Sequence, residues 1–148
     1  MIKLPPPVWL LVFVSVAGLM SALVQWRSML DLRVGPLGVA LFLLGFVGPV
    51  WAISLFQRED TEINPTSKTN KKLVVAGPYA VSRNPMYLGL TIISLGVAFW
   101  IGSLPMFVVP ILVFAVANWI HIPFEEAKMR RQFGAQFDSY AKKVRRWI

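Results

Sequence analysis

The amino-acid sequence predicts an all-α integral membrane helical bundle with about four transmembrane helices and a C-terminal amphipathic cytoplasmic helix. Of the 148 residues, 56% are hydrophobic and only 15% are charged, which is more apolar than an ordinary soluble domain. The apolar residues also form long blocks without charge, because a hydrocarbon solvent hydrates neither charges nor unpaired peptide groups. We expect a single membrane domain over residues 1–148.

Two N-terminal spans are predicted within residues 1–56. The first apolar block runs from Val8 to Val24 and the second from Pro36 to Phe56, and each is close to the ~20 residues that cross a bilayer as a helix. A cleaved signal peptide is the competing interpretation of the first block, since Lys3 precedes it. The block exceeds the usual ~7–15 residues of such peptides and no clear cleavage site follows, which favours a span.

A helical hairpin is predicted over residues 85–122. Its third span runs from Pro85 to Leu104 and its fourth from Met106 to Ile122, with only Pro105 between them. The tip of this hairpin carries no charge, so the sequence leaves open whether the two spans cross the bilayer completely.

The basic residues predict the orientation of the bundle, whose net charge is +8. With four spans, one side would hold both termini and the loop over residues 57–84, and only Arg27 and Arg33 would fall on the other. The positive-inside rule places the side with more basic residues in the cytoplasm, where these charges would suit anionic lipid headgroups. The thirteen basic residues of that side are Lys3, Arg58, Lys68, Lys71, Lys72, Arg83, Lys128, Arg130, Arg131, Lys142, Lys143, Arg145 and Arg146.

Nucleic-acid binding and cysteine-based sites are disfavoured. Nucleic-acid binding would need aromatic residues interleaved with the basic ones, and the sequence does not show them. The absence of cysteine excludes disulfides, thiolate metal sites and a cysteine nucleophile. We predict no metal site.

The two cytoplasmic segments differ in character. The loop begins with a polar connector over residues 58–67, and its second half, from Leu73 to Val81, is apolar and is expected to pack at the membrane surface. In the C-terminal helix, predicted over residues 123–148, aromatic and apolar side chains recur every three or four residues, on one face. That helix would lie on the bilayer or fold back over the bundle as one wall of a pocket. The residues of this face are Phe133, Phe137, Tyr140 and Val144.

Residues 77–89 form the first candidate site. Asn84 and Pro85 fit the cap and first turn of a helix. A helix start attracts anions, and Arg83 adds a positive charge beside it. Gly89, one turn inward, would let a ligand or a neighbouring helix approach the backbone. The structural alternative is a well-capped span with an arginine and a tyrosine at the interface.

Glu125 and Glu126 form the second candidate site. Adjacent carboxylates at the inner end of a span cost desolvation unless cations pair with them. Lys128 and Arg130 offer a structural pairing, whereas the functional alternative is a carboxylate that holds a cationic or polyhydroxylated ligand. His121, the only histidine, lies one turn before Glu125 and would share its face. A lone histidine at a membrane boundary is more often an interface residue than a catalyst.

Two motifs in the C-terminal half carry a family resemblance. The first is Gly-Pro-Tyr-x-x-x-Arg-Asn-Pro-Met-Tyr-Leu-Gly at residues 77–89. The second follows the hairpin and comprises Glu125-Glu126, Phe133-Gly134, Tyr140 and Val144-Arg145-Arg146-Trp147-Ile148. With these motifs, residues 70–148 resemble the superfamily of isoprenylcysteine carboxyl methyltransferases and phospholipid methyltransferases, which are integral membrane enzymes.

The resemblance implies an S-adenosylmethionine pocket at the cytoplasmic face. The carboxylate of the cofactor would suit Arg83 and the helix start, and its ammonium and ribose hydroxyls would suit Glu125 or Glu126. The residues implied to bind the cofactor are Tyr79, Arg83, Asn84, Pro85, Tyr87 and Gly89 on one side, and Glu125, Glu126 and Tyr140 on the other.

Two departures from the family pattern concern the cofactor and the acceptor. Many members have histidine at the position of Asn84, and asparagine also caps helices, so we expect cofactor binding to persist. Carboxyl methyltransferases of the family tend to have arginine at the position of His121. Histidine can be neutral and accept a proton from an amine, which weakens the expectation of a prenylcysteine acceptor. Relatives often continue with proline after the position of Ile148.

The sequence therefore favours a membrane methyltransferase acting on a lipid-borne or prenylated acceptor, either an isoprenylcysteine-like carboxylate or a lipid amine. Methyl transfer is an in-line displacement that requires donor and acceptor to be aligned. An amine acceptor must also lose a proton, for which Glu125 and His121 are the catalytic candidates. The alternatives are an NADPH-dependent sterol-reductase-like enzyme, for which the cytoplasmic part is small, and a non-enzymatic membrane scaffold.

Overall fold

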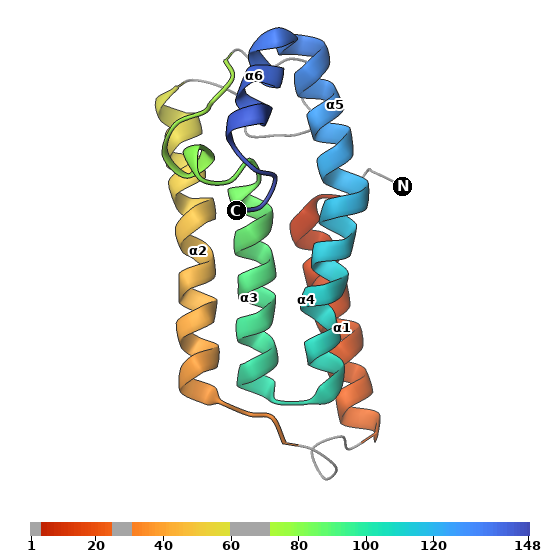
Figure 1. Ribbon diagram of the computed structural model, residues 1–148. Coiled ribbons are helices and arrows are strands. Elements are labelled where there is room, and N and C mark those ends of the chain that lie inside the picture. The colour runs from red at the N-terminus through yellow and green to blue at the C-terminus, as the bar shows by residue number, and fades with distance from the viewer. Residues whose placement is uncertain (1–3, 25–30, 60–71) are drawn as a thin grey trace.

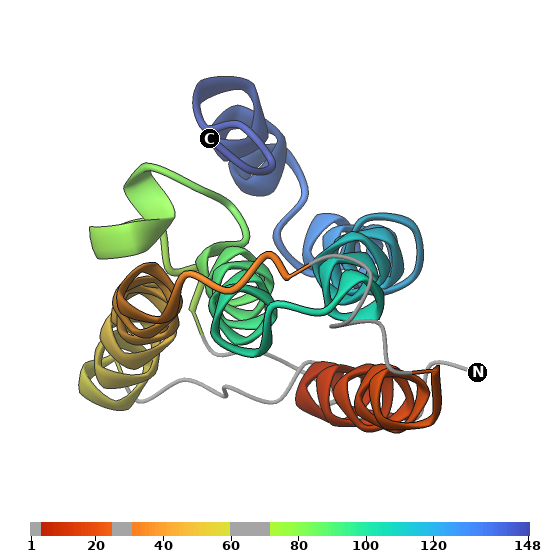
Figure 2. The same ribbon diagram turned by 90° about the horizontal axis from the view of Figure 1, so that it is seen from below.

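The computed structural model describes residues 4–24, 31–59 and 72–148, and every regular element in these ranges is a helix. Helices α1 (Pro6–Val24), α2 (Gly35–Arg58), α3 (Pro85–Ile101) and α4 (Leu104–Val116) lie side by side (Figure 1). Seen along the bundle, α3 lies between α2 and α4, and α1 packs beside α4 (Figure 2). The predicted all-α membrane bundle is confirmed.

The helices differ in length. Helix α1, helix α2 and the continuous helix Leu104–Phe133 are long and apolar enough to cross a membrane, whereas α3 is a shorter apolar helix. The 30-residue helix is about 45 Å long at 1.5 Å per residue, which exceeds a hydrocarbon core of ~30 Å. Its charged residues begin at Glu125, beyond the apolar part over residues 104–122.

The C-terminal region departs from the prediction of one amphipathic helix. Helix α4 continues through a π-helical turn, η3 (Ala117–His121), into α5 (Ile122–Phe133), so the helix does not end at Ile122. It ends at Gly134, whose φ of 50° and ψ of −125° are not helical. Glycine permits this conformation because it has no Cβ. Helix α6 (Ala135–Lys143) then starts in a new direction.

Helices α3 and α4 follow each other as a hairpin whose turn lies at residues 102–103, earlier than expected. Gly102 adopts the left-handed conformation with φ of 78° and Ser103 precedes α4, so Pro105 falls in the first turn of α4 and does not make the break. The amide of Leu32 donates to the carbonyl of Gly102 over 2.9 Å. This bond ties the segment before α2 to the hairpin tip.

Helices α2 and α3 pack through glycines. A Cβ added to Gly89 would lie 2.4 Å from the carbonyl oxygen of Gly45, and one added to Gly96 would lie 2.5 Å from the amide of Phe42. Small residues let helix backbones approach closely in membranes. Gly89 therefore serves helix packing, and this contact holds the first turn of α3 in place.

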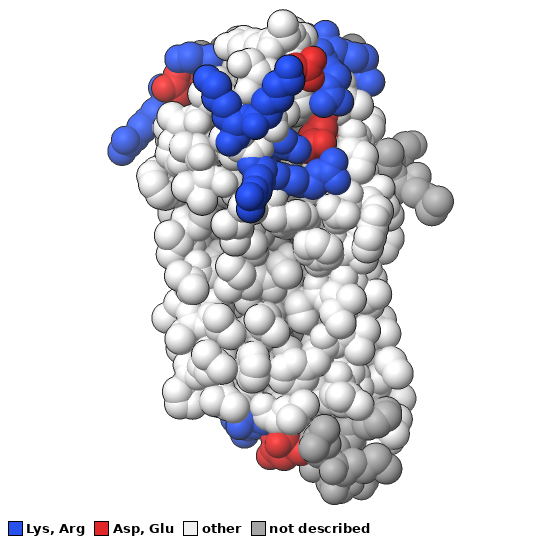
Figure 3. Space-filling view, in the orientation of Figure 1, with Lys and Arg blue, Asp and Glu red and all other residues white. Residues whose placement is uncertain are grey.

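The charges separate to the two ends of the bundle. The basic side chains gather over α5, α6 and the neighbouring segment, and an uncharged belt lies below them (Figure 3). Arg33 lies at the opposite end, against Gly102 of the hairpin tip. Lys3, Arg27, Lys68, Lys71 and most of the predicted polar connector lie outside the described residues.

Candidate active site

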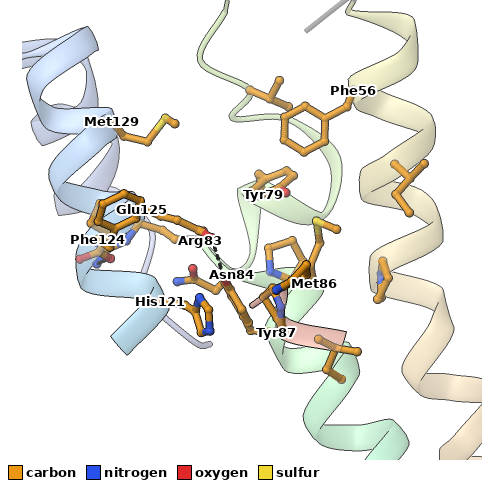
Figure 4. A pocket seen from close by; sticks show the side chains of 18 of the residues that line it. Phe56, Tyr79, Arg83, Asn84, Met86, Tyr87, His121, Phe124, Glu125 and Met129 are labelled. Carbon is orange, nitrogen blue, oxygen red and sulfur yellow. Dashed lines mark hydrogen bonds and ion pairs between the residues drawn. The ribbon is translucent and has the colours of Figure 1, made fainter. Parts of the chain in front are cut away.

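A cavity of about 650 Å³ opens at the basic end of the bundle. Its wall comes from the start of α1, from α2, α3, α5 and α6, and from the 3-10 turn η2 (Gly77–Ala80). This volume lies in the range of pockets that bind small organic ligands. The polar side chains that line it are Lys72, Tyr79, Arg83, Asn84, Tyr87, His121, Glu125, Glu126 and Tyr140. Figure 4 labels Tyr79, Arg83, Asn84, Tyr87, His121 and Glu125 among them.

The structure brings the two candidate sites together. Eight of the nine residues predicted to bind a cofactor line this one cavity, and so does His121. Gly89 does not line it, because it faces Gly45 and Pro49 of α2. The eight are Tyr79, Arg83, Asn84, Pro85, Tyr87, Glu125, Glu126 and Tyr140.

Glu126 forms ion pairs with two arginines. Its Oε1 accepts from Arg83 and its Oε2 from Arg146, each over 2.8 Å. These partners are 43 and 20 residues away in sequence. Burial raises the pKa of Glu126, but hydrogen bonds from Arg146 and Arg83 outweigh burial and hold the pKa below its usual value. Glu126 is therefore an ionised carboxylate whose charge is balanced by Arg83 and Arg146, and these ion pairs hold the cavity wall together.

Glu125 has a different environment. Its Oε1 accepts a 2.5 Å hydrogen bond from the hydroxyl of Tyr87. Burial raises the pKa of the Glu125 carboxyl to about 7, although the Tyr87 bond and the charge of Lys128 act in the opposite direction. Near neutral pH this carboxyl can therefore give or take a proton, which is what general acid–base catalysis needs.

His121 is buried in the π-helical turn and lines the cavity. Its ring stacks on Tyr87, with centroids 6.0 Å apart and an interplanar angle of 27°. Its Nε2 has no hydrogen-bond partner among the described residues. π-Helical turns are frequent at functional sites because the extra residue redirects the side chains around it.

Asn84 occupies the predicted cap position of α3, but its side chain does not cap the helix. The Nδ2 group instead donates to the carbonyl oxygen of Arg146 over 2.9 Å. The backbone amide of Asn84 donates to the hydroxyl of Ser82 over 3.1 Å. The prediction of side-chain capping was therefore wrong, because a carbonyl from the distant C-terminal segment binds the amide group.

Two tyrosines join the remaining walls. The hydroxyl of Tyr140 on α6 donates to the carbonyl oxygen of Tyr79 over 2.7 Å. The ring of Tyr79 packs edge-on against Phe56 of α2, with centroids 5.5 Å apart. Burial raises the pKa of Tyr140 to about 12, so its hydroxyl is neutral and donates. Helix α6 thus forms one wall of the pocket. This is the second of the two predicted placements, in which the C-terminal segment folds back over the bundle.

The cavity also has an apolar part, which sequence reasoning did not identify. Ile93 lies eight residues after Pro85, and therefore about 12 Å further along α3, so the cavity follows this helix away from the charged end. The apolar lining of this part is Leu4, Pro5, Pro6, Pro7, Phe46, Pro49, Ile53, Leu90 and Ile93.

Comparison with known proteins identifies the family. Residues 35–136 match the family model described as phospholipid methyltransferase. The chain belongs to this family. The matched range includes the glutamate pair and the first turn of α3, whereas Tyr140 and Arg146 lie beyond it.

Two curated relatives in this comparison are similar to the chain. Protein-S-isoprenylcysteine O-methyltransferase B of Arabidopsis thaliana is 32% identical over 114 residues, which cover 72% of this chain and 55% of that protein. An uncharacterized protein of Haemophilus influenzae is 35% identical over 63 residues, which cover 43% of this chain and 100% of that protein. The chain thus spans about half the length of the Arabidopsis relative. No solved structure matches it.

In this phospholipid methyltransferase family member, two residues that support the site from outside the cavity lining were not predicted. Arg146 belongs to the C-terminal motif of the resemblance, yet its pairing with Glu126 has no local sequence signal. Asn118 accepts from the indole Nε1 of Trp147 over 3.1 Å. A polar residue in an apolar block was the available signal for Asn118, since buried polar groups in membranes need partners.

Proposed function

We propose that this chain is an integral membrane methyltransferase that transfers the methyl group of S-adenosylmethionine to a lipid-borne acceptor. The name of the Arabidopsis relative describes that protein as an O-methyltransferase of protein S-isoprenylcysteine. The observation that carries the proposal is the shape of the cavity. A polar end, with Glu125 and Tyr87, is continuous with an apolar part along α2 and α3. One chamber therefore suits a soluble nucleotide-like donor and the apolar tail of an acceptor.

The residues of the polar end fit such a donor. Glu125, held by a neutral hydroxyl, suits an ammonium or ribose hydroxyls. Phe124, Met129 and Phe137 offer apolar surface for an adenine ring. Two buried atoms of the lining, Arg83 Nε and His121 Nε2, have no partner among the described residues, and buried polar groups normally have one.

Bound S-adenosylmethionine would supply an electrophilic methyl group on a sulfonium. The chain's own task is to align donor and acceptor and to exclude water. A carboxylate acceptor attacks without losing a proton. An amine acceptor must lose one, and Glu125 or His121 would take it.

A lipid amine is the second candidate acceptor, and the charges of the lining favour it. The two basic side chains of the described lining, Lys72 and Arg83, pair with Glu59 and Glu126. A carboxylate acceptor would need an available cation, whereas Glu125 is suited to bind or deprotonate an amine. The name of the Arabidopsis relative gives protein S-isoprenylcysteine as the acceptor of that protein.

We also propose that the cavity opens to the cytoplasm. The basic residues gather at the end where it opens, and the positive-inside rule places such an end on the cytoplasmic side. The donor would enter from that side, and the acceptor would enter from the bilayer.

Isothermal titration of the detergent-solubilised protein with S-adenosylhomocysteine tests the proposal. Binding supports a methyltransferase. Binding of NADPH instead would support a sterol-reductase-like enzyme, and binding of neither would support a scaffold. Mass spectrometry of lipids incubated with the protein and labelled S-adenosylmethionine would then identify the acceptor.

A further inference from the structure

The last residues of the chain, 144–148, form a segment that we call the strap. It follows α6 and returns to the start of α3 (Figure 1). The carbonyl oxygen of Arg145 accepts from the backbone amide of Arg83 over 3.1 Å, and that of Val144 accepts from Arg83 Nη1 over 3.0 Å. With the bond from Asn84 to the carbonyl of Arg146, three consecutive strap residues bind the start of α3.

The side chains of the strap contact the opposite wall. Arg146 Nη2 pairs with Glu126 of α5 over 2.8 Å. Trp147 donates to Asn118 and stacks on Phe114 of α4, with ring centroids 4.6 Å apart. The strap thus joins the two halves of the cavity wall through backbone bonds on one side and side-chain bonds on the other.

Glu126 is the point where these contacts meet. Arg83 donates to its Oε1 over 2.8 Å, and Arg146 donates to Oε2 over 2.8 Å and to Oε1 over 3.4 Å. The Glu126 side chain is only 14% exposed, so the loss of one arginine would leave a largely buried carboxylate with one partner. Because Glu126 adjoins Glu125 and holds Arg83, its orientation sets the geometry of the polar end.

We propose that Arg146 is a positioning residue, which acts through Glu126 to hold the polar end of the cavity in its ligand-binding arrangement. This inference rests on the proposed methyltransferase function. It assigns to the strap a role in the site even though Arg146 does not line the cavity.

Arg145 and Arg146 offer a matched experiment, because they are adjacent and replacement of either by alanine removes one positive charge. The Arg145 side chain is exposed, whereas that of Arg146 reaches Glu126. In titrations with S-adenosylhomocysteine, Arg146→Ala should weaken binding about tenfold, and Arg145→Ala should leave it about unchanged. Arg146→Lys keeps the charge but loses the planar fork, so it should weaken binding by an intermediate factor.

A double-mutant cycle tests whether Arg146 acts through Glu126. In a Glu126→Gln background, Arg146→Ala should cause little further loss of affinity, because the ion pair with the carboxylate is already absent. An equal loss in both backgrounds would overturn the inference, and so would equal effects of Arg145→Ala and Arg146→Ala. If Arg146→Ala does not fold, Arg146→Lys compared with Arg145→Lys provides the same test. Failure of the unaltered protein to bind S-adenosylhomocysteine would instead refute the proposed function, and the inference with it.

Discussion

The hydroxyl of Tyr87 lies 2.5 Å from Oε1 of Glu125, so the first turn of α3 meets the start of α5 at the cavity wall. These residues are 38 positions apart in sequence. The ring of His121 stacks on the aromatic ring of the same tyrosine. Tyr87 therefore contacts both candidate proton acceptors.

Glu125→Gln should weaken binding of S-adenosylhomocysteine about tenfold or more, because the amide cannot offer a charged acceptor to the ligand. Titration calorimetry measures the change. Asp138→Asn is the matched control, since this carboxylate pairs with Arg130 on the exposed surface and does not line the cavity. Equal affinities of the two variants would remove Glu125 from the ligand-binding set.

Binding should also depend on pH. The pKa of Glu125 is raised to about 7, so its carboxylate form predominates above that pH and is lost below it. Affinity for S-adenosylhomocysteine should be constant above about pH 8. At lower pH the affinity should fall, and the loss should approach about tenfold for each pH unit. Tyr87→Phe removes a hydrogen bond that favours the carboxylate, so the fall should begin at higher pH. If Tyr87→Phe leaves the pH dependence of binding unshifted, the Tyr87 hydroxyl does not control the pKa of Glu125.

His121→Phe should separate the two acceptor classes. The phenyl ring can still stack on Tyr87 but cannot accept a proton. Transfer of labelled methyl groups to a lipid amine should fall by roughly 10²–10⁴, the usual contribution of a general base, if His121 is that base. Transfer to a carboxylate acceptor should change little. Scintillation counting of the separated lipid products measures both, and an unchanged rate with an amine would leave Glu125 as the base.

Gly89→Ala should destabilise the bundle by about 1–3 kcal/mol, the usual cost of overpacking. The added Cβ would lie 2.4 Å from the carbonyl oxygen of Gly45, and backbone cannot move aside easily. Gly18→Ala is the control, because its Cβ would meet the flexible end of Met106 at an ordinary 3.4 Å. Thermal unfolding in detergent should show a lower midpoint for Gly89→Ala alone.

The orientation can be tested with single cysteines, since the chain contains none. Lys142→Cys on α6 should resist a membrane-impermeant maleimide added to intact cells and react after the cells are opened. Asp31→Cys, near the hairpin tip, should react in intact cells. The reverse pattern would place the cavity on the outer side of the membrane.

Much of the fold could be predicted from the sequence because hydrophobicity is a local property. Charge-free blocks predicted the helices and the hairpin, and the alternation of Phe137 and Tyr140 with polar residues predicted the face that lines the pocket. The break at Gly134 was missed, because glycine also occurs inside membrane helices, as Gly45 and Gly96 show. Whether a glycine ends a helix or packs inside one depends on the neighbouring helices. The sequence of a single segment does not contain that information.

The composition of the candidate site was also predictable, since the sequence alone determined which polar residues end up at the charged end of the bundle. Desolvation requires charges to leave the hydrocarbon, and that rule acts on each residue separately. Only the tertiary structure decided which of them pair. It joined Glu126 to Arg83 and Arg146, left Glu125 to Tyr87, and turned Gly89 towards α2. A hydrogen bond depends on ångström distances between residues many positions apart, and those distances exist only once the helices have packed.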